Sequence, residues 1–169
     1  MQVRKAFILR GVNMEWIVRR LDNAELDAAL ALAWKTYLEF EASDYSPEGV
    51  TTFKRDIIEN AAFRNDCLSG KNRIWGAFDS SKLVGIIGMR GESHICLVFT
   101  LGEYHRKGIA TAIFDQLLID VSIENPKVEQ ITLNSAPYGL PFYHHIGFID
   151  RDTEQTKDGI RYTPMVYKL

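Results

Sequence analysis

The chain has 169 residues, of which 46% are hydrophobic, and this size and composition suit one domain with a full core. Its formal net charge of −2 at pH 7 predicts no general attraction to nucleic acid or acidic lipid. No apolar run is long enough to cross a membrane, and the N-terminus lacks the apolar stretch of a signal peptide. Because Cys67 and Cys96 lie in apolar contexts, we expect reduced thiols in a cytoplasmic protein.

The first half of the chain is predicted to hold one strand and two helices before a run of strands. Residues 1–13 show no clear period, and we expect them to be an extension that the core does not need. The expected single domain covers residues 14–169 and begins with a strand at 15–20. A capping box of Asp22 and Glu25 then starts a helix that runs to about residue 40. Ser46 and Pro47 have the residue types that start a second helix.

The remaining elements follow from apolar periodicity and turn residues. After a helical or irregular piece around 63–68, a meander of three strands is predicted over 73–78, 83–90 and 93–100. A helix over 108–123, a strand over 130–134 and a short helix over 140–146 precede two strands, 148–152 and 160–167. The order β-α-α-β-β-β-α-β-α-β-β predicts one α/β domain.

The start of the helix at Gly108 carries an unusual charge pattern. Arg106 and Lys107 precede it, and no acidic residue lies between His105 and Phe114, although helix N-termini usually favour carboxylates. Backbone N–H groups at such a position bind anions. The spacing from Gly102 to Gly108 is one residue too long for a P-loop, and the dinucleotide pattern G-x-G-x-x-G is absent. The pattern therefore indicates a ligand diphosphate in some other kind of loop.

Two motifs resemble those of the GCN5-related N-acetyltransferase (GNAT) family. The sequence HRKGIA, residues 105–110, resembles the family signature [QR]-x-x-G-x-[GA], with His105 departing from the usual Gln or Arg. The sequence NSAPYGLPFYHHIGF, residues 134–148, is similar to a later motif that ends F-Y-x-x-x-G-F. The resemblance covers residues 15–169 and implies a mixed, mostly antiparallel sheet flanked by helices.

The resemblance also implies acetyl-CoA as donor, with its pyrophosphate on the helix start and its pantetheine arm along the preceding strand. The residues implied in donor binding are Val98, Phe99, Thr100, His105, Arg106, Lys107, Gly108, Ile109, Ala110, Thr111 and Asn134. The implied activity is direct acetyl transfer to a primary amine of a small molecule or peptide, and a homodimer is compatible with it. The alternative is an acyl-CoA-binding regulatory module without catalysis.

Candidate catalytic groups follow from the same comparison. Tyr143 occupies the general-acid position of the family, and a phenol with a pKa of about 10 can protonate a thiolate; the alternative is a core aromatic. His94 matches the position of the base, with Glu92 or a chain of waters as alternatives. Glu41 and Asp44 are candidates to attract a cationic amine, or else belong to a solvated loop.

Two further chemistries are not favoured by the sequence. Cys96 has no cation near it in sequence, so an acetyl-cysteine intermediate is not expected. His144 and His145 are adjacent and point apart on a helix, so no metal site is proposed.

Overall fold

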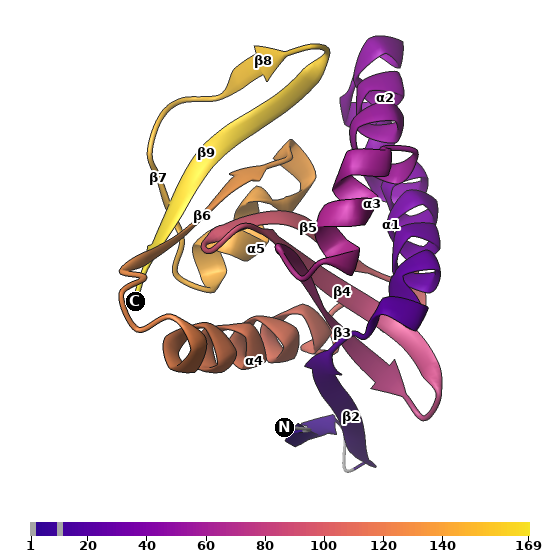
Figure 1. Ribbon diagram of the computed structural model, residues 1–169, viewed down its shortest axis with the longest axis vertical. Helices are drawn as coiled ribbons and strands as arrows, with labels where there is room; N and C mark the ends of the chain where they lie inside the picture. The colour runs from indigo at the N-terminus through magenta and orange to yellow at the C-terminus, as the bar shows by residue number, and fades with distance from the viewer. Residues whose placement is uncertain (1–2, 10–11) are drawn as a thin grey trace.

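The computed structural model describes residues 3–9 and 12–169, with side chains from Trp16 onward. Its sheet has the strand order β1-β2-β3-β4-β5-β6-β9-β7, and β8 pairs with β9 (Figure 1). Only β5 and β6 are parallel among the paired strands. The strands are β1 (Val3–Leu9), β2 (Val12–Arg20), β3 (Asn72–Asp79), β4 (Lys82–Arg90), β5 (His94–Thr100), β6 (Gln130–Ser135), β7 (Ile149–Asp150), β8 (Gln155–Lys157) and β9 (Ile160–Lys168). The predicted mixed, mostly antiparallel sheet is confirmed.

The helices begin where the capping residues indicate. The predicted capping box is present, with the Asp22 side chain accepting from Ala24 N–H and Glu25 accepting from Asp22 N–H. Ser46 Oγ accepts from Gly49 N–H at 3.3 Å and caps the second helix. The longer helices are α1 (Leu26–Phe40), α2 (Pro47–Phe53), α3 (Ala61–Leu68), α4 (Ile109–Glu124) and α5 (Leu140–His145). The short helical turns are η1 (Asn23–Glu25), η2 (Ala42–Asp44), the π-turn η3 (Lys54–Ile58), η4 (Gly102–Tyr104) and η5 (Pro137–Gly139).

Three features differ from the sequence-based expectation. The segment 1–13 contains β1, which pairs along its length with β2, while residues 1, 2, 10 and 11 lie outside the described residues. Hairpin pairing adds β8, because the turn at Asp158 and Gly159, both at positive φ, folds residues 155–157 back onto β9. The strand expected over 148–152 is shorter in the structure: only β7 is a strand, and residues 151–152 form a bend.

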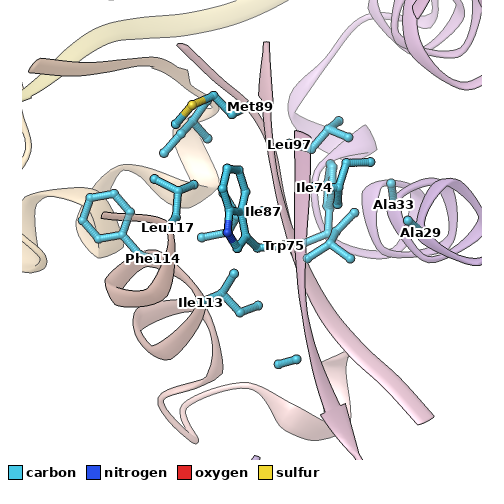
Figure 2. Close-up of a cluster of buried hydrophobic side chains, with 14 of the residues drawn as sticks. Ala29, Ala33, Ile74, Trp75, Ile87, Met89, Leu97, Ile113, Phe114 and Leu117 are labelled. Carbon is cyan, nitrogen blue, oxygen red and sulfur yellow. The ribbon is translucent and has the colours of Figure 1, made fainter. Parts of the chain in front are cut away.

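The core packs on both faces of the central strands. Figure 2 shows Ile74 and Leu97 facing Ala29 and Ala33 of α1, while Trp75 and Ile87 face the α4 side chains. All of these residues are buried. The two helices therefore cover opposite faces, and α1 and β5 are held together by direct packing.

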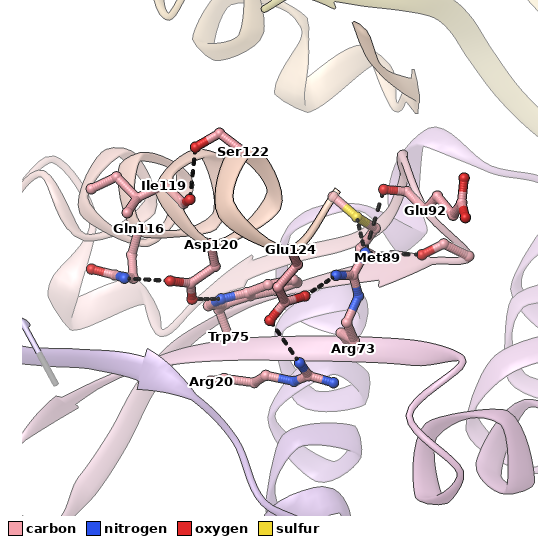
Figure 3. A network of polar contacts seen from close by, with 11 residues as sticks. Arg20, Arg73, Trp75, Met89, Glu92, Gln116, Ile119, Asp120, Ser122 and Glu124 are labelled. Atoms are coloured by element: carbon pink, nitrogen blue, oxygen red, sulfur yellow. Dashed lines mark hydrogen bonds and ion pairs between the residues drawn. The ribbon is translucent and has the colours of Figure 1, made fainter. Parts of the chain in front are cut away.

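Polar contacts fix α4 against the sheet as well. Trp75 Nε1 donates to Asp120 Oδ2 at 2.7 Å, and Gln116 Nε2 donates to the other oxygen at 2.9 Å (Figure 3). Near the end of α4, Glu124 pairs with Arg20 of β2 and Arg73 of β3. Contacts to two strands restrict the position of α4, and thereby set where its N-terminus lies relative to β5.

No helix in the described ranges 3–9 and 12–169 is long and apolar enough to cross a membrane.

Removing residues 1–13 should leave a folded protein, because β2 keeps its pairing with β3 over residues 17–20. For a chain that starts at Met14 we expect a native circular dichroism spectrum and a Tm within about 4 °C of the full chain, or about 1 kcal/mol. A chain that starts at Leu21 is the control, since it also loses the buried Trp16 and Val18, and it should lose cooperative unfolding. Loss of cooperative unfolding in the Met14 chain would contradict the prediction.

Candidate functional site

Two cavities meet at one place beside β5. The larger, of about 730 Å³, lies between the second half of β5 and the start of α4, and we call it the donor cavity. The smaller, of about 280 Å³, lies between β5, α2 and the π-turn η3, and we call it the acceptor cavity. Both are lined by Glu41, Val98, Phe99, Gly139 and Tyr143. These five residues form the junction of the two cavities.

The donor cavity exists because β5 and β6 separate. Their parallel ladder contains only the pairs His94↔Thr132 and Ile95↔Leu133. From Cys96 onward, the edge of β5 that faces β6 has no strand partner within the described part of the chain. Val98, Phe99 and Thr100 therefore line an open strand edge, which can pair with an extended ligand. The family resemblance implies that the pantetheine arm binds along these three residues, and this stays a prediction.

The start of α4 forms the other end of the donor cavity. Gly108 takes φ +78° as the residue before the helix and supplies no side-chain cap. The first bond of the helix runs from Ala112 N–H to Gly108 O, so the N–H groups of Ile109, Ala110 and Thr111 have no partner within the helix. With no acidic residue in the first turn, these amides present an uncompensated positive end to the cavity.

The cations of this loop have different roles. Arg106, at φ +57°, is exposed and lines the cavity. Lys107 does not line it, and its ammonium lies 5.0 Å from the centre of the Tyr104 ring. His105 Nε2 lies 2.7 Å from Thr100 O, and because a carbonyl can only accept, this nitrogen is the donor. His105 thus ties the loop to the end of β5.

Helix α1 forms the wall opposite β5. Thr36 is buried, and its Oγ1 has no hydrogen-bond partner among the described residues, although Thr36 lines the donor cavity. One turn later, the Phe40 ring packs 4.5 Å from the His105 ring, measured between centres. Neither Thr36 nor Phe40 was predicted as a site residue from the sequence; their only signal there is their place on the predicted first helix.

The acceptor cavity has aromatic walls. Tyr37 and Phe53 stack with ring centres 4.1 Å apart, and Tyr45 stacks on Tyr37 at 5.7 Å. These three rings line the cavity, and none of them was predicted as a site residue from the sequence. Thr52 Oγ1 donates to Asp158 O at 3.0 Å and joins α2 to the β8–β9 turn, next to Ile160 in the cavity wall. The cavity is therefore closed by a contact between residues more than 100 positions apart in sequence.

The junction brings a phenol and a carboxylate together. Tyr143, on α5, packs edge-on against Phe148 with ring centres 5.8 Å apart. Burial raises its pKa well above the usual value, and the nearby Glu41 carboxylate raises it further, so the phenol stays protonated. Burial also raises the pKa of Glu41 to about 7, with a smaller contribution from the negative charge of Asp44.

Asp44, predicted to attract the acceptor amine, and Asn134, predicted to bind the donor, lie in different places. Asp44 donates its N–H to Glu41 O at 2.9 Å but lines neither cavity. Asn134, at the end of β6, is exposed and lines the acceptor cavity, not the donor cavity in which it was expected.

His94 and Glu92, the two residues predicted from the sequence as the general base, lie away from the junction. His94 lines the acceptor cavity at the start of β5, and its Nδ1 lies 2.9 Å from Thr132 Oγ1. Burial, and then the charge of Arg90, lower its pKa, which makes it a weaker base. Val98 is four residues further along β5, about 13 Å at the usual strand rise. Glu92 is exposed and lines a separate hollow.

Cys96 is half-buried and lines the acceptor cavity. It is the extra residue of a bulge, since Gly88 pairs with Leu97 and Met89 pairs with Ile95. Its Sγ lies 3.6 Å from Gly88 O, and burial raises the pKa of the thiol to about 12. A thiol with this pKa is a poor nucleophile at neutral pH.

Comparisons with known structures show the same fold in other proteins. The PaiA N-acetyltransferase of Thermoplasma acidophilum, solved in complex with coenzyme A, has a TM-score of 0.75 at 19% identity, covering 92% of this chain and 100% of that one. A GCN5-related N-acetyltransferase from Rhodopseudomonas palustris has a TM-score of 0.73 at 18% identity, covering 90% and 94%. An acyl-CoA N-acyltransferase from Pseudomonas aeruginosa has 0.61 at 16%, covering 89% and 97%. At these identities the likeness establishes the fold.

The sequence itself carries the family assignment. No curated protein matches the chain. The family model described as an acetyltransferase (GNAT) domain matches residues 41–169, which include the junction, the open edge of β5 and the start of α4. The chain belongs to the GNAT acetyltransferase family.

Proposed function

We propose that this protein transfers an acetyl group from acetyl-CoA to a primary amine of a small molecule or peptide. The observation that carries the proposal is the junction, where a cavity suited to a CoA arm meets a cavity with an acidic residue at its inner end. Acyltransferases of this family act on amine acceptors in general, and the Thermoplasma relative was solved with coenzyme A. The acceptor cavity, at about 280 Å³, suits a small amine or the end of a peptide.

The residues of the donor cavity fit acetyl-CoA in three respects. The open edge of β5 offers backbone groups to the two amides of pantetheine. Thr36 Oγ1, which has no partner among the described residues, supplies a further hydrogen-bonding group on the opposite wall. The N–H groups of Ile109, Ala110 and Thr111 would hold the pyrophosphate, with Arg106 beside them.

Tyr143 would act as the general acid. Its phenol is protonated at neutral pH and lies at the junction, where it would donate its proton to the departing thiolate of CoA. The high pKa of Cys96 supports direct transfer to the amine without an acetyl-cysteine. The sequence predicts His94 as the general base that removes the proton of the amine, and this stays a prediction.

A charged side chain at Gly108 should abolish donor binding. In Gly108→Glu the carboxylate meets the site of the pyrophosphate, and the residue must adopt φ near +78°. We expect the Kd for acetyl-CoA, measured by calorimetry, to rise more than about tenfold, roughly 1.4 kcal/mol or more. Gly91→Glu is the matched control, because Gly91 also has a positive φ (+59°) and an added Cβ meets nothing within 4 Å. Equal affinities in the two variants would place the donor elsewhere.

Removing the Tyr143 hydroxyl should separate catalysis from binding. Tyr143→Phe keeps the ring packed on Phe148, so we expect little change in stability and acetyl-CoA affinity within a few-fold of wild type. We expect kcat to fall about 10²–10⁴-fold, measured as release of free thiol with an accepted amine. Tyr162→Phe, which loses only a hydrogen bond to Gln155, is the control and should retain kcat.

Two outcomes would contradict this proposal. Full activity in Tyr143→Phe would make the tyrosine a core aromatic. Saturable acetyl-CoA binding without thiol release, across amino acids, polyamines, aminoglycosides and peptide N-termini, would favour the non-catalytic regulatory module.

A further inference from the structure

Glu41 lies at the junction of the donor and acceptor cavities. It directly follows α1, and its N–H donates to Tyr37 O at 2.9 Å, so Tyr37 and Glu41 are one turn apart on the same face. Both side chains line the acceptor cavity, and Glu41 also lines the donor cavity. A group that bridges the two cavities at this point can contact both an amine in one and a thioester in the other.

Two polar groups here lack partners. Tyr37 is 1% exposed, and its hydroxyl has no hydrogen-bond partner among the described residues. The Glu41 carboxylate likewise makes no ion pair or hydrogen bond with a described side chain. Buried polar groups are nearly always paired, and a buried carboxylate most of all. An unpaired carboxylate beside an unpaired hydroxyl in a cavity indicates a ligand that is a cation and a hydrogen-bond donor.

The charges around Glu41 do not neutralise it. Its near neighbours are the tyrosines Tyr37, Tyr45 and Tyr143 and the acidic Asp44. Arg90 and His94 also line the acceptor cavity, and His105 and Arg106 line the donor cavity, but none of the four is among the groups that act on the Glu41 carboxyl. Burial and Asp44 raise the pKa of Glu41 to about 7, so near neutral pH the carboxyl can both accept and release a proton.

We propose that Glu41 is the general base of the reaction, taking a proton from the acceptor ammonium group while the Tyr37 hydroxyl accepts a second N–H of the same nitrogen. This inference rests on the proposed acetyl transfer. It assigns the removal of the ammonium proton to a residue at the junction and not to His94. His94 is hydrogen-bonded to Thr132 and lies about 13 Å from Val98 along β5.

The proton balance is complete with these groups. Glu41 takes one proton from the ammonium group, and the neutral nitrogen forms a bond to the carbonyl carbon as the carbon–sulfur bond breaks. Tyr143 donates its proton to the sulfur, and the second proton lost by the nitrogen restores the phenol. Glu41 then releases its proton to solvent. Each turnover therefore yields an amide, free CoA thiol and one proton.

The test is the pH–rate profile of Glu41→Gln beside a matched control. Gln keeps the size of the side chain but cannot take a proton, so we expect kcat/KM at pH 7 to fall about 10²-fold or more. The acidic limb of the wild-type profile, expected near pH 7, should disappear, while acetyl-CoA affinity stays within a few-fold. Glu39→Gln is the control, because Glu39 is exposed on the same helix and lines neither cavity; its profile should match wild type.

Stability provides an independent measurement on the same variant. A carboxyl whose pKa is raised by folding stabilises the protein below its unfolded pKa, and this contribution is lost as the pH rises toward and through 7. The Tm of Glu41→Gln should therefore exceed that of wild type at pH 8, and the difference should shrink at pH 5. Glu41→Ala is a second variant for the kinetic comparison, in case the amide of Gln binds in the cavity.

The outcomes separate this inference from the proposed function. An active wild type whose acidic limb persists in Glu41→Gln and Glu41→Ala would overturn the role of Glu41 alone. If His94→Ala removes that limb instead, His94 is the base. A wild type that releases no thiol with any amine would overturn the proposed function, and the role of Glu41 with it.

Discussion

The separation of β5 from β6 is the constraint on which the site depends. Two paired residues hold the parallel strands together, and beyond them the edge of β5 is left open. An open edge in the middle of a sheet is costly unless something pairs with it, because backbone N–H and C=O groups lose water on burial. Here the edge lines the donor cavity, between α1 and the start of α4. The gap in the sheet is thus the feature that admits a ligand.

The helices on the two faces keep this gap in place. Packing of Ala29 and Ala33 of α1 against the sheet holds one wall, and the contacts of Asp120 and Glu124 with β2 and β3 hold α4. Because α4 is fixed along its length, its first N–H groups stay aimed at the cavity without a side-chain cap. The binding groups are mostly backbone groups, and rigid packing is what orients them.

Unsatisfied polar groups gather around the same two cavities. Among the residues that the structure describes, Thr36 Oγ1 and the buried Tyr37 hydroxyl have no hydrogen-bond partner, and Glu41 pairs with no cation. Each of these costs stability in the free protein. All three lie close together, on a single turn of α1 and the residue that follows it. A site that binds polar ligands requires such a group of polar side chains.

The sequence by itself determined the family, the order of most elements and the start of α4. Those features depend on local patterns: a capping box at Asp22, apolar periodicity, and a glycine after two cations. It also selected Tyr143 and Glu41, but it could not show that they share one junction. That proximity, the Tyr37 hydroxyl without a partner among the described residues, and the burial of His94 beside Thr132 were decided by the tertiary structure. The reason is that the burial of a side chain depends on residues that folding brings together from α1, β5 and α5. The pKa of a carboxyl such as Glu41 depends on that burial.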